Sequence, residues 1–143
     1  ICTCLVGSEM CIRDRNTKVI YFSINYDGFF KFHPKHKDDQ YVLNLFNKDQ
    51  ESDKGIGQKA VGKNCSQIIN KLFSKSHKTF VFDSSWDVSK NKKFQNMFLD
   101  FCENVLEKNK ISLDRWLDFR RENIKKNKSK LFLRNKDFLA LKL

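Results

Sequence analysis

The chain has little proline and glycine and few cysteines for its length. One proline and 5 glycines occur among 143 residues, a composition that excludes collagen-like and proline-rich disordered chains. Three of the 5 cysteines fall in the first 15 residues, so only Cys65 and Cys102 remain beyond them. Two cysteines make no disulfide framework, and they favour a reducing, cytoplasmic setting. No apolar run approaches the roughly 20 residues that a membrane helix needs, so we expect no membrane partner.

The first residues do not read as native protein. Cys4 to Arg15 reads CLVGSEMCIRDR, which resembles, at every codon of one frame, the translation of a transposase adapter used in sequencing libraries. We interpret residues 1–15 as an adapter-derived artefact and exclude them from the reasoning on the fold. We then expect the native sequence to run from Asn16, with its own amino-terminal part cut away.

Positive charge is in excess, but arginine is scarce. The net charge is +11, and the 28 basic residues are 22 lysines and 6 arginines. Nucleic-acid surfaces cluster basic residues on one face, with arginine reading the bases, whereas these lysines are spread along the chain. We therefore expect a solvated, lysine-rich surface. A small basic nucleic-acid-binding module is kept as an alternative, and it predicts an affinity that falls steeply with salt. A noncatalytic α/β interaction module is a further alternative.

Apolar periodicity predicts strands that alternate with helices. We expect strands at 18–25, 29–32, 79–83, 131–133 and 137–143, and helices at 38–49, 61–73, 94–106 and after Ser112, which we expect to be an N-cap. This alternation predicts an α/β sheet covered by helices. The first strand reads as buried on both faces, and such a strand needs neighbours on both sides. We therefore expect part of a doubly wound sheet whose other half lies upstream.

A polar turn after the first strand is the leading candidate site. Asn25, Tyr26, Asp27 and Gly28 follow the carboxyl end of that strand, where open α/β sheets place their ligands. The Tyr26 hydroxyl and the Asp27 carboxylate could orient an acceptor or accept a proton. An ordinary turn in which Asp27 caps its own backbone is the alternative.

A second polar loop could lie beside that turn. It concentrates Asp49, Gln50, Asp53 and Lys54 in one segment, which continues to Gly62. Its glycines superficially resemble a phosphate-cradling loop, but that motif needs a strand immediately before it. We expect a flexible joint instead.

The histidine pair and the two remaining cysteines are weaker candidates for a functional site. His33 and His36 have a spacing that two metal ligands could use, but Pro34 between them prevents a regular helix, and we expect a surface loop without metal. Cys65 and Cys102 lie on apolar helix faces, which predicts core packing rather than a reactive thiolate.

Five short motifs occur in a recognisable order. They are Ser23–Gly28 (SINYDG), Asn47–Gly62 (NKDQESDKGIGQKAVG), Ser84–Trp86 (SSW), Trp116–Arg121 (WLDFRR) and Leu133–Leu141 (LRNKDFLAL). Their order and spacing resemble a group of bacterial class I S-adenosylmethionine-dependent methyltransferases. The match runs from about residue 18 to Leu143.

The resemblance implies a fold, a cofactor and site residues. Residues 16–143 would form the C-terminal half of one domain, with a partial Rossmann-like sheet. Strand 18–25 would be the fifth of seven, strand 79–83 the sixth, and the closing segment the seventh, inserted antiparallel between two others. The cofactor would be S-adenosylmethionine, bound by upstream residues, and the partner a small-molecule acceptor. On this reading Tyr26 and Asp27 are catalytic, whereas Asn25, Gln50, Asp53 and Lys54 bind the substrate. The fragment alone is expected to be inactive.

Overall fold

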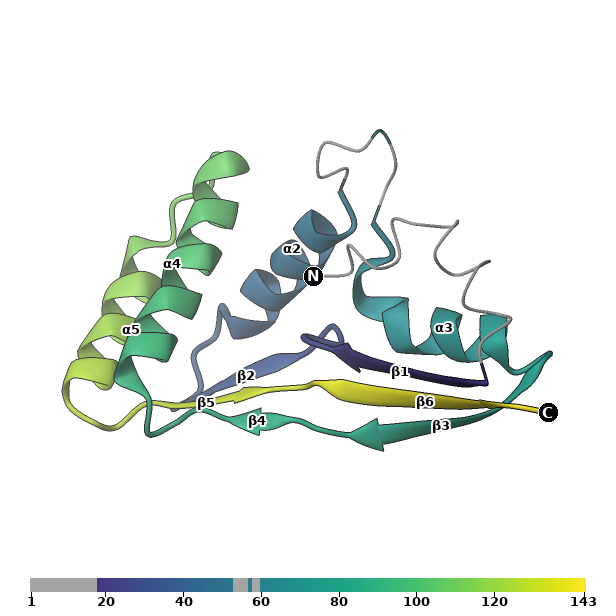
Figure 1. The fold of residues 1–143 in the computed structure, drawn as a ribbon. Coiled ribbons are helices and arrows are strands. Elements are labelled where there is room, and N and C mark those ends of the chain that lie inside the picture. The colour runs from purple at the N-terminus through teal and green to yellow at the C-terminus, as the bar shows by residue number, and fades with distance from the viewer. Residues whose placement is uncertain (1–17, 53–56, 58–59) are drawn as a thin grey trace. The chain divides into compact units, whose positions relative to one another are not determined.

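The computed structural model describes residues 18–52, 57 and 60–143. They form a mixed α/β structure with two small antiparallel sheets and four α-helices (Figure 1). The chain divides into two compact units whose segments alternate along the sequence. Unit 1 contains the chain up to Phe29 together with Gln50–Ser85 and Arg134–Leu143, and unit 2 contains Phe30–Asp49 and Trp86–Leu133.

Unit 1 is built on a three-stranded sheet. Its strands are β1 (Val19–Ile24), β3 (His77–Asp83) and β6 (Lys136–Lys142). The order is β1-β6-β3, and β6 pairs antiparallel with both neighbours. Because both outer strands oppose β6, β1 and β3 run parallel to each other. The register sets Ile24 and Asp83 on either side of Lys136, so the carboxyl ends of the outer strands meet at the amino end of β6.

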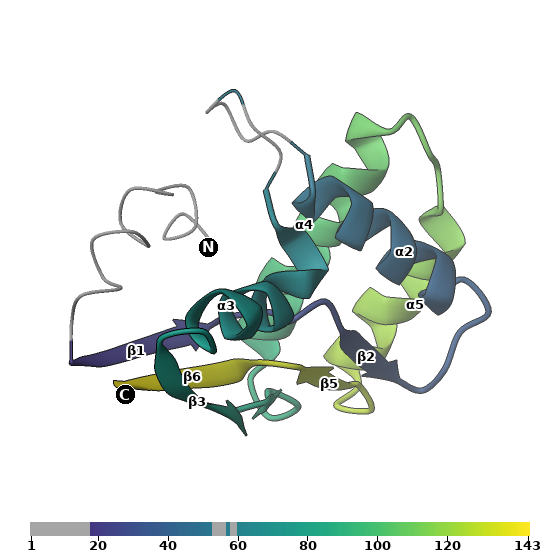
Figure 2. The same ribbon diagram turned by 90° about the vertical axis from the view of Figure 1, so that its right-hand side faces the viewer.

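One face of this sheet is covered by α3 (Cys65–Phe73), which follows the short 3₁₀ helix η2 (Gly62–Asn64) (Figure 2). Cys65, Ile69 and Phe73 recur every four residues and therefore share one side of α3. They pack with four buried residues of the sheet: Ile20, Ile24, Phe138 and Ala140. The prediction that Cys65 is a core residue is confirmed.

The expectation that the first strand is buried on both faces is wrong. Burial alternates along β1: Ile20 and Ile24 are buried, whereas Val19 and Tyr21 are each 60% exposed. Successive side chains of a strand point to opposite faces, and α3 covers only one of them. Within the described residues β1 is also an edge strand, because β6 is its sole neighbour there.

Unit 2 contains the second sheet and the other three helices. Its strands are β2 (Phe30–His33), β4 (Trp86–Asp87) and β5 (Lys130–Leu133), in the order β2-β5-β4 and antiparallel throughout. Its helices are α2 (Asp39–Gln50), α4 (Lys92–Lys108) and α5 (Asp114–Lys125). All these segments apart from β4 were predicted, with bounds that differ by a few residues.

Aromatic rings form the centre of unit 2. Phe30 on β2 lies 5.5 Å from Phe46 on α2 and 5.0 Å from Phe98 on α4, centroid to centroid, and both contacts are edge-to-face. Phe32 makes the same kind of contact with Trp116 of α5 at 6.0 Å. Aromatic pairs prefer such tilted geometries because ring edges are positive and ring faces negative.

Some details of the helices differ from expectation. On α4, Met97 and Phe101 are apolar but 44% and 49% exposed. The buried stripe runs instead along Phe98, Cys102 and their helical neighbours, which confirms that Cys102 is a core residue. Ser112 is not the N-cap of α5: its hydroxyl donates to the Asp114 carboxylate at 2.8 Å, and Leu113 precedes the helix.

In the part of the chain that the structure describes, we find no helix with the length and apolar character needed to cross a membrane.

Candidate functional site

The turn Asn25–Gly28 follows β1 directly, as predicted, and is tied to the residues before β6. Tyr26 has a φ of 69° and Gly28 a φ of 75°, so the chain reverses through two left-handed residues. The Tyr26 N–H donates to Asn135 Oδ1 at 2.8 Å, and the Asp27 N–H donates to the Arg134 carbonyl at 2.7 Å. These bonds hold the turn against the amino end of β6.

Asp27 is buried within this turn, with 5% of its surface exposed. Its Oδ1 accepts a hydrogen bond from the Ser66 hydroxyl at 2.8 Å, and its Oδ2 lies 3.7 Å from Arg134 Nε. Arg134 also donates from Nε and Nη2 to the Asp27 carbonyl, at 3.1 and 2.6 Å. Both carboxylate oxygens therefore face a partner, and Asp27 joins the turn to α3 and to the start of β6.

Gly28 allows the turn to lie directly against η2. A Cβ on Gly28 would overlap the side chain of Lys63 and come within 2.9 Å of its Cα. Lys63 Nζ lies 4.0 Å from Glu51 Oε1, and Gly62 packs closely against the Glu51 side chain. Glu51 and Gly62 of the second polar loop therefore lie close to Lys63, the residue that the turn contacts.

The other predicted site residues differ in their surroundings. Asn25 is exposed, whereas Tyr26 and Gln50 are half-buried. Asp53 and Lys54 lie outside the described residues. Asp49 belongs to unit 2, where its Oδ1 accepts a hydrogen bond from Lys108 at 2.7 Å.

A carboxylate that the sequence reasoning did not single out lies at the same edge of the sheet. Asp137 Oδ1 accepts hydrogen bonds from Ser23 at 3.0 Å and from Ser84 at 3.1 Å, and Tyr21 donates to the same carboxylate. These bonds, the one from Tyr21 foremost, hold the pKa of Asp137 below its ordinary value. Asp137 and Ser84 both fall in motifs that carry the resemblance, and this was the one signal that could have marked them.

Asn135 lies between the turn and this carboxylate. It is 3% exposed, and its backbone carbonyl accepts from the Ser84 N–H at 3.2 Å. Its side-chain oxygen is used by Tyr26, but its Nδ2 has no hydrogen-bond partner among the described residues. A buried amide group without a partner is uncommon and calls for an explanation.

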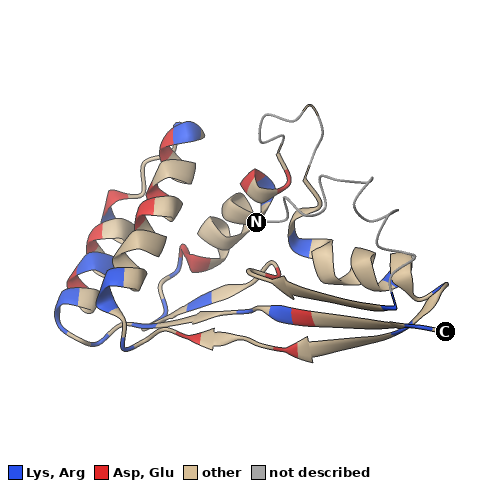
Figure 3. Cartoon of the chain, in the orientation of Figure 1, with Lys and Arg blue, Asp and Glu red and all other residues tan. Residues whose placement is uncertain are grey.

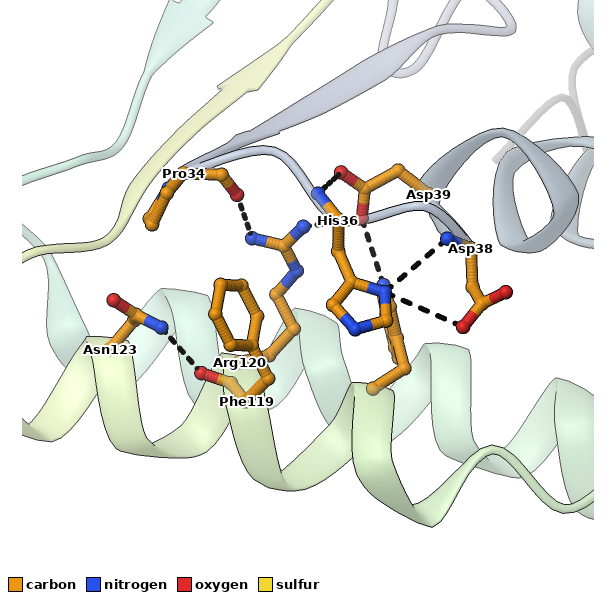
Figure 4. Close-up of polar contacts among 8 residues, drawn as sticks. Pro34, His36, Asp38, Asp39, Phe119, Arg120 and Asn123 are labelled. Carbon is orange, nitrogen blue, oxygen red and sulfur yellow. Dashed lines mark hydrogen bonds and ion pairs between the residues drawn. The ribbon is translucent and has the colours of Figure 1, made fainter.

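Unit 2 has a buried polar centre of its own, shown in Figure 4. Arg120 is fully buried; it forms an ion pair with Asp39 and donates from Nη1 to the Pro34 carbonyl at 2.6 Å. Asp39 Oδ1 also accepts from Trp116 Nε1 at 2.8 Å, and Asp39 Oδ2 accepts from the His36 N–H at 2.8 Å. Burial lowers the pKa of Arg120, and Asp39 opposes that shift. The arrangement fixes the amino end of α2 against α5.

The two histidines do not come together as metal ligands. His33 is exposed on β2, and the His36 ring packs against Phe119 at 5.1 Å while its Nδ1 lies 3.4 Å from Asp38 Oδ2. Across residues 18–52, 57 and 60–143, no group of three His, Cys, Asp or Glu side chains is arranged to hold a metal ion.

Basic residues occur on helices and strands of both units, with acidic residues among them (Figure 3). Asp or Glu partners engage several of them, including Lys108, Arg121 and Lys126. The alternative of a nucleic-acid-binding module, which needs basic residues gathered on one face, stays a prediction.

A scan against protein-family models finds no family that matches this chain, and a search of curated proteins finds no match either.

Proposed function

We propose that this chain is the acceptor-side half of a class I S-adenosylmethionine-dependent methyltransferase with a Rossmann-like sheet. The observation that carries the proposal is the strand order of unit 1. Strand β6 lies antiparallel between β1 and β3, which run parallel to each other. The resemblance implies the same arrangement for the seventh strand, between the fifth and the sixth. A polar turn at the carboxyl end of β1 supports the same reading.

The described residues do not form a glycine-rich loop of the kind that binds the methyl donor. The glycine-bearing segment that ends at Gly62 is preceded by helix α2, whereas a dinucleotide-type glycine loop follows a strand directly. We therefore assign the binding of S-adenosylmethionine to residues outside this chain and give no cofactor-binding residue within it. When bound, the cofactor would supply an electrophilic methyl group.

The task of this half is to place the acceptor. Displacement of a methyl group needs alignment of the nucleophile and a group that accepts its proton. Tyr26 is our choice for the contact with the acceptor, because it lies in the turn just past the end of β1 and is half-buried. Asp27 is a positioning residue for Tyr26, because its bonds to Ser66 and Arg134 hold the turn. Asn25, Gln50, Asp53 and Lys54 remain proposed substrate contacts.

The test begins with the uninterrupted gene upstream of codon 16, recovered from the source DNA. We expect an in-frame strand, glycine-rich turn and helix, and the intact protein should bind S-adenosylhomocysteine in a calorimetric titration. Tyr26→Phe should leave that binding unchanged and reduce methyl transfer roughly 10²-fold, the lower end for loss of one acid–base group. A start codon directly before Asn16, or an intact protein that binds no cofactor, would overturn the proposal.

A further inference from the structure

Three hydroxyls and two polar side chains form one group at the edge of the unit 1 sheet. We call it the Asp137 cluster, and its members are Tyr21, Ser23, Ser84, Asn135 and Asp137. Ser23 is paired with Asp137 across β1 and β6, and Ser84 follows β3 directly. The cluster therefore lies where the carboxyl ends of β1 and β3 meet the amino end of β6.

The hydrogen-bond polarity of the hydroxyls is determined by Asp137. Ser23 and Ser84 each donate to Asp137 Oδ1, and Tyr21 donates to the same carboxylate. A hydroxyl has one proton and two lone pairs, so after these donations each oxygen can only accept a further hydrogen bond. A ligand that approaches these hydroxyls must therefore be a donor, and the negative charge of Asp137 favours a positive one.

Asn135 adds the complementary group. Its Oδ1 is occupied by the Tyr26 N–H, whereas its Nδ2 is buried and has no hydrogen-bond partner within the described part of the chain. The bond from the Ser84 N–H to the Asn135 carbonyl continues the β3–β6 pairing to residue 135. Residues 135 and 137 of an extended chain project to the same face. By strand alternation, the side chain of Asn135 therefore starts from the same face of the sheet as Asp137 and its hydroxyl partners.

We propose that the Asp137 cluster binds a protonated amine that carries a carbonyl oxygen close by, as in an α-amino amide. The ammonium N–H groups would donate to the hydroxyls and to Asp137, and the carbonyl would accept from Asn135 Nδ2. Phosphate, sulfate and carboxylate groups are disfavoured, because they would meet acceptor oxygens and a negative charge. The inference rests on the proposed function, and there it makes the methyl acceptor an amine, which must give one N–H proton to the Asp137 carboxylate before its lone pair can attack the methyl group.

The test is an NMR titration of the full chain with glycinamide, followed through backbone and side-chain amide resonances. The matched probe is its N-trimethyl analogue, which keeps the charge and the carbonyl but has no hydrogen on the cationic nitrogen. We expect glycinamide to shift the Asn135 side-chain amide and its neighbours saturably. The trimethyl analogue should bind at least about ten-fold more weakly, the loss expected when charge-assisted hydrogen bonds are removed.

Variants separate this site from general charge attraction. Asp137→Asn should weaken glycinamide binding by about ten-fold or more. Asp87→Asn is the matched control, because Asp87 is an exposed carboxylate that binds the Ser89 hydroxyl in unit 2, and it should leave binding unchanged. If Asp137→Asn does not fold, Ser84→Ala serves instead, with a smaller loss. Equal binding of the two probes, an equal loss in Asp87→Asn, or no saturable shift would overturn the inference.

A further experiment must distinguish an acceptor amine from the ammonium group of the cofactor. The amino-acid end of the cofactor also carries an ammonium group beside a carboxylate. In the intact protein, S-adenosylhomocysteine and glycinamide should therefore bind together without competition, and displacement of glycinamide would overturn the inference. Because the first titration contains no cofactor, its failure would leave the proposed methyltransferase intact, and absence of cofactor binding by the intact protein would remove the methyltransferase alone.

Discussion

Arg120 and Asp39 lie 81 residues apart in the sequence, and their side chains form an ion pair in which the guanidinium is fully buried. Arg121, the next residue, pairs instead with Glu103 while 42% of its own side chain is exposed. The chain thus contains two adjacent arginines with the same kind of partner and opposite solvent exposure.

Removal of the carboxylate should therefore have very different effects at the two sites. Asp39→Ala leaves a buried charge without its partner, and we expect the free energy of unfolding to fall by about 3–5 kcal/mol. Glu103→Ala should cost less than about 1 kcal/mol. Urea denaturation followed by circular dichroism measures both. Adding Arg120→Met to Asp39→Ala should recover part of the loss, because it removes the uncompensated charge; equal losses for the two single variants would contradict this account.

Two glycines with nearly equal φ angles provide a second matched pair. Gly28 has a φ of 75° and lies against Lys63, whereas Gly57 has a φ of 76° and an added Cβ there would meet no atom of the described residues within 4 Å. Gly57→Ala should cost only the left-handed backbone strain, about 1–2 kcal/mol. Gly28→Ala adds a steric overlap with backbone, so we expect about 2–5 kcal/mol. Thermal melts of the two variants decide the matter, and a Gly28→Ala protein as stable as Gly57→Ala would show that the turn can move away from η2.

The Asp137 cluster predicts an acid-sensitive component of stability. Because the pKa of Asp137 is lower in the folded protein than its ordinary value, its contribution is present above the unfolded pKa of about 4. That contribution disappears as the pH falls through the folded pKa. The difference in unfolding free energy between the unsubstituted protein and Asp137→Asn should therefore be largest near neutral pH and vanish in strong acid. A difference that stays constant over this range would rule out the ionised carboxylate as its cause.

The two core cysteines should be protected from alkylation. Cys65 and Cys102 are free thiols and buried, and burial raises the pKa of Cys102 far above its usual range. Because the thiolate is the reactive form, iodoacetamide should label these two cysteines only after denaturation. Peptide mapping by mass spectrometry separates them from Cys2, Cys4 and Cys11. Rapid labelling of Cys102 in the native protein would show that α4 opens locally.

The local pattern of the sequence was enough to place most helices and strands. The spacing of Cys65, Ile69 and Phe73 marks one face of α3, and the run before Asn25 marks β1. The local pattern did not show that β2 pairs with β5 and not with β1, because strand pairing depends on contacts between distant segments. For the same reason the alternation of two compact units along the chain was not foreseen.

The candidate site was predicted only where one short segment forms it. The turn at Tyr26 and Asp27 was recognised from adjacent residues, whereas the sequence allowed the second polar loop to lie beside it without requiring this. Asp137 was missed because its hydroxyl partners come from elements that lie far away in the sequence, with Ser84 53 positions before it. The role of Arg120 was not predicted, since nothing near it in the sequence indicates Asp39 as its partner.

The central place of β6 has a consequence for how the protein is made. Within the described residues β6 is the only strand that joins β1 to β3, and it is translated after both. While the ribosome adds the intervening chain, neither β1 nor β3 can pair with β6, and the pairing of both strands is delayed until β6 has emerged. We therefore expect a stop codon before Lys136 to remove every strand pairing of the unit 1 sheet that the described residues make.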